Sequence, residues 1–138
     1  MRYYVAFGES SERNWWDWFN KPGFEHTYAW TAVSDFRCIG VEFNKDGLYA
    51  AYRECSALAM LDKVLCREDC TCVIEVEIME RTQYAARGLM NCVTTVKAFL
   101  GLPGCRVLTP WGLARKLLAH GGKLHYGRFG EMVRPVSE

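Results

Sequence analysis

The chain has 138 residues, of which 50% are hydrophobic and 24% are charged, and its formal net charge is +1. These values predict one globular domain over residues 1–138, and they exclude a disordered chain and a strong general attraction to polyanions. No stretch approaches the roughly 20 apolar residues that span a bilayer, and the N-terminal apolar stretch is too short for a secretion signal. We therefore expect a cytoplasmic protein with no membrane span.

The first third of the chain predicts a strand, a short helix and a hairpin. The aromatic and β-branched run 2–7 ends at Gly8, which is typical of a strand. Segment 10–23 offers a serine N-cap, a cluster of aromatic residues and a Pro-Gly stop, so a short helix is expected there. The strand-like runs 25–32 and 38–44 are joined by turn-forming residues, which predict an antiparallel hairpin.

Three further elements follow this hairpin. A turn at Lys45–Gly47 leads into a third strand over 48–54, so the strands form a meander. Segment 55–65 has a broad apolar face and favours a helix. In segment 71–79, "TCVIEVEIM", apolar residues alternate with glutamates, which predicts a half-buried strand.

Two well-bounded helices are expected in the last third of the chain. Helical apolar spacing begins after Asn91 and stops at Gly101. Thr109 is a suitable N-cap for a second helix that starts with proline and closes at Gly121. The basic tail from Lys123 onward is expected to be loosely packed. This order predicts an α+β domain in which a small antiparallel sheet packs against helices.

The seven cysteines do not predict a metal site. Cys66, Cys70 and Cys72 lie close together in "CREDCTC". Zinc sites usually combine such a group with a second cysteine pair or with histidines, and no second pair is present. Because there is no secretion signal, reduced structural thiols are the better interpretation. We expect no metal and no cofactor.

Cys92 and His26 are the candidate catalytic residues. Cys92 follows Asn91 at the start of a predicted helix, where the exposed amides favour a thiolate, the nucleophilic form of cysteine. His26 follows the "KPGF" turn at the start of a predicted strand, which would hold a general base rigidly. It shares one side of that strand with Tyr28 and Trp30, whose apolar surroundings would lower its pKa toward or below neutrality unless a partner restores it.

A third residue should orient the imidazole, and two are suitable. If the hairpin turn is centred at Asp35, the residue numbers of two residues paired across the strands add up to about 70. His26 then faces Asn44 directly. Glu42 then lies one diagonal step away on the same side of the sheet. We slightly prefer Glu42 over Asn44 as the residue that orients the imidazole. The backbone N–H of Cys92 is the expected first oxyanion donor. A second donor could come from the preceding segment, from Gln83, Tyr84 or Asn91.

These residues carry a resemblance to a known family. A histidine strand after a turn, an acidic or amide residue in the next strand and a later "NC" opening a helix resemble the circularly permuted branch of the papain-like (NlpC-like) cysteine hydrolases. Segments 22–26, 91–101 and 109–113 are also similar to small uncharacterised phage and prophage proteins. The resemblance implies a permuted papain-like architecture and a cysteine peptidase or amidase, or an acyltransferase, acting on a peptide, amide, thioester or ester. If the chain is phage-encoded, the expected cytoplasm is that of the host cell.

The match to one part of that branch is incomplete. Relatives of lecithin retinol acyltransferase carry a second histidine near the first and an "NCEHF" box, whereas Val93, Thr94 and Thr95 follow Cys92 here. Lipid acyl transfer is therefore not expected.

Two other classes of function remain open. Histidines in aromatic strands and cysteines near helix starts are more often structural, so a non-catalytic, phage-type binding or assembly protein on the same fold is the alternative. Its contact surface would be formed by tryptophans, namely Trp15, Trp16, Trp18 and Trp111. Nucleic-acid binding is less expected because the net charge is near zero. It would use the basic C-terminal third with its aromatic residues: Arg106, Trp111, Arg115, Lys116, Lys123, Tyr126, Arg128 and Arg134.

Overall fold

The fold is an antiparallel sheet covered by helices, as predicted for an α+β protein. The computed structural model describes residues 1–10, 20–79, 91–102 and 106–127. Six strands form one sheet in the order β4-β3-β2-β1-β5-β6, and all neighbouring strands are antiparallel. The elements in chain order are β1 (Arg2–Gly8), β2 (His26–Ser34), β3 (Arg37–Asn44), β4 (Gly47–Arg53), α1 (Ala57–Leu65), β5 (Cys70–Glu77), α2 (Cys92–Leu100), α3 (Pro110–Ala119) and β6 (Lys123–Tyr126).

Strand β1 lies at the centre of the molecule. It pairs with β2 on one edge and with β5 on the other. Every residue of the strand after Arg2 is buried, because helices cover both faces of the sheet at this point. The aromatic and β-branched run that predicted this strand therefore supplies the middle of the core.

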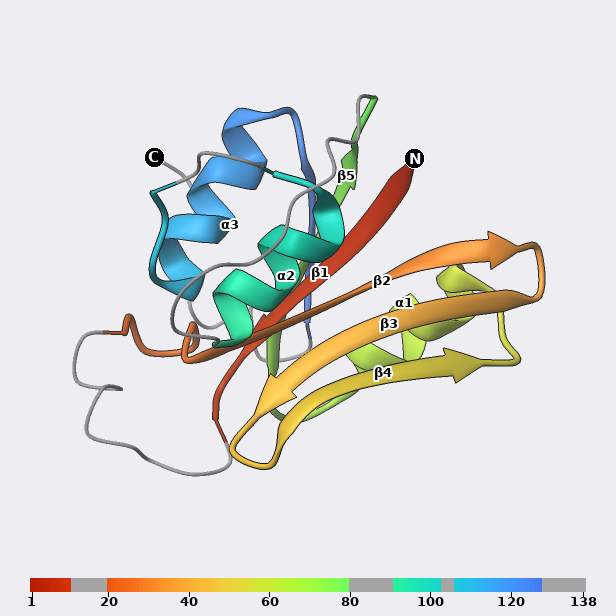
Figure 1. Ribbon diagram of the computed structural model, residues 1–138, viewed down its shortest axis with the longest axis horizontal. Coiled ribbons are helices and arrows are strands. Elements are labelled where there is room, and N and C mark those ends of the chain that lie inside the picture. The colour runs from red at the N-terminus through yellow and green to blue at the C-terminus, as the bar shows by residue number, and fades with distance from the viewer. Residues whose placement is uncertain (11–19, 80–90, 103–105, 128–138) are drawn as a thin grey trace.

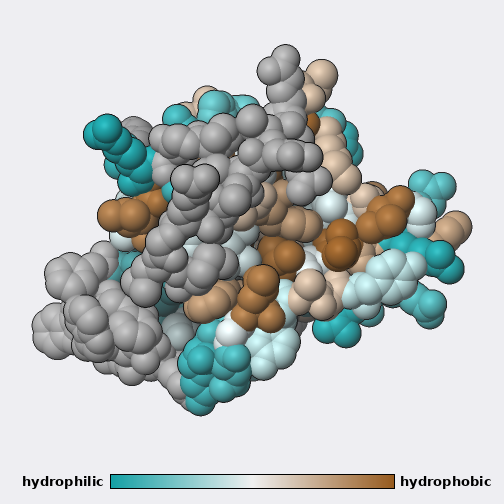
Figure 2. Space-filling model, viewed as in Figure 1, coloured by the Kyte–Doolittle hydropathy of each residue, from teal (hydrophilic) through white to brown (hydrophobic). Residues whose placement is uncertain are grey.

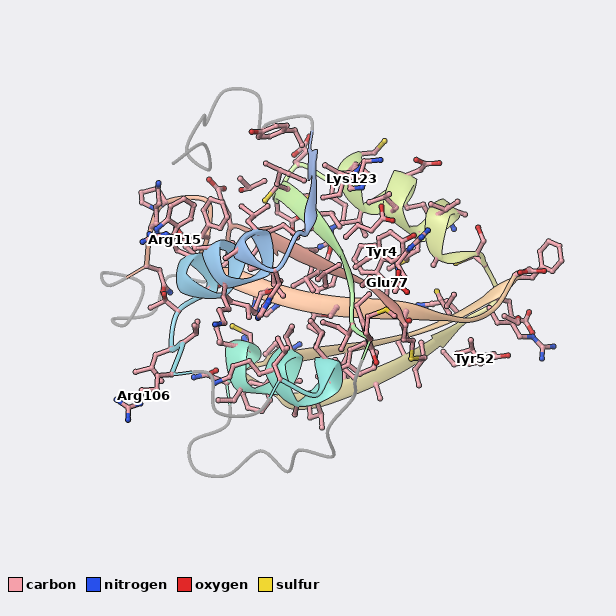
Figure 3. The ribbon with its side chains drawn as sticks, turned by 90° about the horizontal axis from the view of Figure 1, so that it is seen from above. Tyr4, Tyr52, Glu77, Arg106, Arg115 and Lys123 are labelled. Carbon is pink, nitrogen blue, oxygen red and sulfur yellow. The ribbon has the colours of Figure 1, made fainter. Side chains whose placement is uncertain are left out.

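Helices cover the two faces of the sheet unequally. Figures 1 and 3 show α1 on one side and α2 with α3 on the other. The larger core lies beneath α2 and α3, and it includes Phe7, Ile74 and Leu113. The smaller core lies beneath α1, where the indole N–H of Trp30 donates a hydrogen bond to the carbonyl of Ala57 at 3.1 Å.

Strand β5 differs from the half-buried strand that its sequence predicts. The alternating residues Cys72, Ile74 and Val76 do face the larger core. Val73, on the opposite face, is also fully buried and belongs to the smaller core under α1. The period of two was predicted correctly, but it does not reveal that a helix also covers the other face.

The helix ends agree with the boundaries predicted from capping residues. The Asn91 side chain accepts from the Thr94 N–H at 2.9 Å, and the Thr94 hydroxyl accepts from the Asn91 N–H at 2.8 Å, a reciprocal capping box at the start of α2. Gly101 ends that helix with a left-handed conformation, φ 67°. Thr109 caps α3, and Pro110 occupies its first position.

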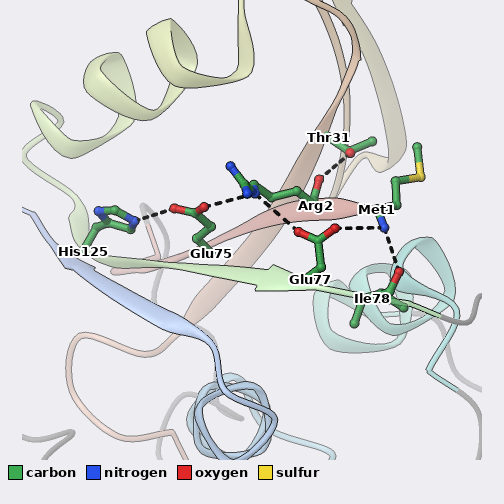
Figure 4. Close-up of polar contacts among 7 residues, drawn as sticks. All are labelled: Met1, Arg2, Thr31, Glu75, Glu77, Ile78 and His125. Carbon is green, nitrogen blue, oxygen red and sulfur yellow. Dashed lines mark hydrogen bonds and ion pairs between the residues drawn. The ribbon is translucent and has the colours of Figure 1, made fainter.

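Strand β6 contradicts the expectation that the chain is loosely packed from Lys123 onward. Residues Lys123–Tyr126 pair with β5. His125 Nε2 lies 2.9 Å from Glu75 Oε2, and Arg2 Nε lies 3.2 Å from Glu75 Oε1 and 3.4 Å from Glu77 (Figure 4). These polar contacts fix β6 and the start of β1 to β5. The sequence prediction failed because four residues are too few to show a strand period.

Two expectations concern the remaining regions. The short helix predicted within 10–23 falls largely on residues 11–19, which lie outside the described residues. No helix in the described ranges has both the length and the apolar character needed to cross a membrane.

Candidate active site

The structure brings His26 and Cys92 together. His26 is the first residue of β2 and Cys92 is the first residue of α2. Helix α2 packs against β2 and β3, and the Cys92 side chain lies close enough to the His26 ring to help raise the pKa of the imidazole. Both side chains are only partly buried, with 22% of the His26 side chain exposed. Each side chain therefore keeps some contact with solvent in the described structure.

Glu42 contacts one ring nitrogen of His26. The distance from His26 Nε2 to Glu42 Oε1 is 3.0 Å. The β2–β3 register pairs Tyr28 with Glu42, so the hairpin register predicted from a turn centred at Asp35 is correct. Glu42 reaches His26 diagonally across these strands. Acidic, imidazole and thiol groups thus lie in one chain of contacts.

Asn44, the other predicted orienter, has a different role. It is the last residue of β3 and pairs with Gly47 across the β3–β4 turn. Its side-chain oxygen accepts a hydrogen bond from the Asp46 N–H at 2.9 Å. This short-range contact caps the turn, which is a common use of asparagine. The geometry of the described residues gives the orienting contact to Glu42.

The charges of the site favour an imidazolium at neutral pH. Burial lowers the pKa of His26, but hydrogen bonds to Cys92 and Glu42 and their negative charge outweigh burial and raise the pKa to about 9. The hydrogen bond from His26 lowers the pKa of Glu42. Burial does lower the pKa of the ring, as expected from its apolar neighbours, but its partners Cys92 and Glu42 restore the protonated form.

The N-terminus of α2 supplies backbone donors next to Cys92. The first N–H groups of a helix have no acceptor within the helix. Asn91 satisfies the N–H of Thr94, and its own N–H is bonded to the Thr94 hydroxyl, so that N–H is not available as an oxyanion donor. Gln83 and Tyr84 lie outside the described residues. Of the predicted oxyanion donors, the N–H of Cys92 lies at the first position of α2, where backbone N–H groups have no acceptor within the helix.

Three residues that sequence reasoning did not assign to the site lie beside it. The Tyr28 ring centroid is 6.2 Å from that of His26, and the Arg67 guanidinium lies 5.8 Å from the Tyr28 ring centroid. Arg67 forms a two-point ion pair with Asp69, at 2.9 and 2.8 Å. The positive charge of Arg67 also contributes to the lowered pKa of Glu42. In the sequence, Arg67 and Asp69 belong to a short charged run between two cysteines, which does not reveal a location.

The cysteine cluster does not converge on one point. Cys66 is exposed, whereas Cys70 and Cys72 are buried in different cores. Burial raises the pKa of both Cys70 and Cys72 to about 12, which keeps them as neutral thiols. Among the described residues, no group of three or more His, Cys, Asp or Glu side chains could hold a metal ion.

The residues expected to form the contact surface of a binding protein, or of a nucleic-acid-binding protein, do not gather in one place among the described residues. Trp111 packs against Phe24, with ring centroids 4.8 Å apart, and Lys21 Nζ lies 3.6 Å from the Trp111 ring centroid. Trp111 is therefore a partly buried part of the core margin. Trp15, Trp16 and Trp18 are outside the described residues. The basic side chains of Arg106, Arg115 and Lys123 lie well apart from one another (Figure 3).

Comparisons of the chain with family models, curated proteins and solved structures find no match. The functional assignment therefore depends on the geometry around Cys92.

Proposed function

We propose that the protein is a cysteine-dependent hydrolase or acyltransferase of the peptidase or amidase type. Cys92 is the nucleophile, His26 is the general acid and base, and Glu42 orients His26. The observation that carries the proposal is the His26 ring, which contacts Cys92 and Glu42 at the same time. Such a nucleophile, base and orienter arrangement is the recurring device of covalent catalysis.

The first half of the reaction forms an acyl-enzyme. The Cys92 thiolate attacks the carbonyl carbon of a peptide, amide, thioester or ester, and the carbonyl electron pair moves to its oxygen. The N–H of Cys92, at the positive end of α2, stabilises that oxyanion. When the bond to the leaving group breaks, the His26 imidazolium donates its proton to the departing group. A thioester on Cys92 remains.

The second half returns the enzyme to its starting state. A water molecule or another acyl acceptor attacks the thioester carbonyl, and neutral His26 takes a proton from the attacking group. The carbon–sulfur bond breaks, and Cys92 leaves as a thiolate beside the restored imidazolium. Water as acceptor gives hydrolysis, and an amine or alcohol gives acyl transfer.

The proposed architecture is the permuted papain-like (NlpC-like) one. Three features support it: the histidine strand precedes the cysteine helix, the cysteine is the first residue of its helix, and the helix packs on the histidine strand. Within this proposal, the similarity of segments 22–26 and 91–101 to phage proteins reflects the two segments that build the site. Location in a host cytoplasm is part of the same proposal.

Selective alkylation tests the nucleophile. Substoichiometric iodoacetamide near pH 6 should modify Cys92 first, because an ordinary thiol is less than about 1% thiolate there. Cys66 is the internal control, since it is exposed but has no contact with His26 in the described structure. His26→Ala should abolish the preference for Cys92. Mass mapping that finds the first label on Cys66, or spread evenly, would refute the enzyme assignment.

A second measurement tests acyl transfer itself. An activated ester such as p-nitrophenyl acetate should place one acetyl group on Cys92 of the wild-type protein. Cys66→Ser should leave that acetylation unchanged, and Cys92→Ser should remove it. Fast alkylation of Cys92 without any acetyl adduct would show that Cys92 is a reactive thiol that does not carry out acyl transfer.

The alternative is a non-catalytic binding or assembly protein on the same fold, and one observation favours it. Strand β4 is at the edge of the sheet, and Leu48, Tyr49 and Tyr52 on it are each at least half exposed. Figure 2 shows hydrophobic residues scattered among hydrophilic ones over the strands β2 to β4. Evenly distributed alkylation, together with loss of partner binding in Tyr52→Ser, would support this alternative.

A further inference from the structure

A second pair of cysteines lies on the α1 side of the sheet. Cys38 Sγ and Cys55 Sγ are 3.9 Å apart. Cys38 is on β3 and only 1% exposed, while Cys55 lies in the link between β4 and α1 and is partly exposed. The register fixes this proximity, because Cys38 pairs with Arg53, two residues before Cys55.

An open cavity of about 320 Å³ reaches Cys55 but not Cys38. Its lining is Arg53, Cys55, Met60, Lys63, Val64 and Arg67. The lining thus contains three basic side chains, one thiol and no carboxylate. Arg67 is paired with Asp69, whereas in the described part of the chain no carboxylate forms an ion pair with Arg53 or Lys63. The cavity therefore favours a small anion positioned over a thiol.

We propose that Cys55 and Cys38 form a thiol–disulfide exchange site for an anionic, low-molecular-weight disulfide. The Cys55 thiolate attacks one sulfur of the external disulfide, which forms a mixed disulfide and releases the first external thiolate. Cys38 Sγ then attacks Cys55 Sγ, and the second external thiolate leaves. Two protein thiols are oxidised to one disulfide, and one external disulfide is reduced to two thiols, which take up the two protons that the protein thiols lose.

The order of attack follows from access and charge. Cys55 faces the cavity and its basic side chains, which attract the anionic reagent. Cys38 is shielded from the reagent, and burial followed by its hydrogen bond to Cys55 raises its pKa to about 11. It therefore remains a thiol until the mixed disulfide forms beside it. A disulfide requires the sulfurs to approach to about 2.05 Å, which side-chain rotation can supply from 3.9 Å.

Two probes of different charge test this site in the full chain. Oxidised glutathione is anionic, and bis(2-hydroxyethyl) disulfide is neutral. Mass mapping should show a Cys38–Cys55 disulfide with either probe, formed about tenfold faster with the anionic one at low ionic strength and slowed by added salt. Excess dithiothreitol should reverse it.

Charge variants separate the cavity from general thiol reactivity. The double change Arg53→Gln and Lys63→Gln should slow the reaction with oxidised glutathione about tenfold and leave the neutral probe unaffected. Arg37→Gln, which removes a basic residue outside the cavity, is the matched control and should change neither rate. Equal rates in all three proteins would overturn the anionic site.

Cys38→Ala tests the resolving thiol and keeps that buried position apolar. The mixed disulfide should then persist on Cys55. Two outcomes would overturn the pair: a mixed disulfide that never forms on Cys55, or a wild-type protein in which only Cys66 reacts. Neither depends on Cys92, so this test is independent of the proposed catalytic activity.

Discussion

Replacing Glu42 by glutamine should weaken the protonated state of His26. Glutamine keeps an oxygen acceptor of similar size but removes the negative charge 3.0 Å from His26 Nε2. In the wild type the pKa of His26 rises from 6.5 to about 9, and Cys92 and Glu42 share the effect. The Glu42 side chain is 45% exposed and so is partly screened. We expect its loss to lower the pKa of His26 by about one pH unit, which corresponds to roughly 1.4 kcal/mol.

The titration can be followed directly by NMR of the histidine rings from about pH 5 to pH 10. The chain has three histidines, and His26→Ala identifies the resonance of His26. Asn44→Ala is the matched control, because that residue lies on the same strand but bonds the Asp46 N–H. A His26 midpoint that is unchanged in Glu42→Gln, or lowered as much by Asn44→Ala, would refute the role given to Glu42.

The same change has a defined effect on stability as a function of pH. The pKa of His26 is higher in the folded state than its ordinary value of 6.5, so protonation stabilises the fold. That contribution is complete below about pH 6.5 and is lost as the pH rises through about 9. Urea unfolding should therefore show Glu42→Gln less stable than wild type by about 1 kcal/mol at pH 6, with the difference vanishing at pH 10. A difference that does not depend on pH would point to packing instead.

Two further predictions concern the helix and the cysteine cluster. Thr94→Val preserves shape but removes the hydroxyl that accepts from the Asn91 N–H, so it should lower the free energy of unfolding by about 1 kcal/mol in urea denaturation; an unchanged midpoint would show that water replaces the contact. Chelator should leave the melting temperature unchanged, because Cys66, Cys70 and Cys72 point to different surroundings; stoichiometric zinc in protein purified without added metal would contradict this.

Local chemistry explains why much of the fold and part of the site could be predicted. Capping by Asn91 and Thr109 depends on neighbouring residues, so sequence spacing suffices to place Cys92 at the first position of α2. The hairpin is also local, and its turn sets the register that brings Glu42 toward His26. The contact between Cys92 and His26 is long-range, and it was expected from the chemistry of a cysteine nucleophile with a histidine base and from the resemblance to the permuted papain-like enzymes.

Competing local and long-range interactions explain what could not be predicted. Register alone favours Asn44 as the partner of His26, but the asparagine is closer in sequence to the Asp46 N–H and caps the turn. Strand β6 has no strong pattern of its own, and it forms because β5 offers a free edge and Glu75 bonds His125. Arg67 reaches Tyr28 from a loop, and no periodicity places a loop side chain.

The central place of β1 has a consequence for how the chain acquires its structure during synthesis. Strand β1 leaves the ribosome before the other strands of its sheet, and β2 follows soon enough to pair with one of its edges. The other edge has to wait until Cys70–Glu77 has been made, because β5 is its partner. Until then an apolar strand with unpaired backbone groups is open to other nascent chains. We therefore expect slow translation between Arg53 and Cys70 to promote aggregation, while a chaperone that covers strand edges would counteract it.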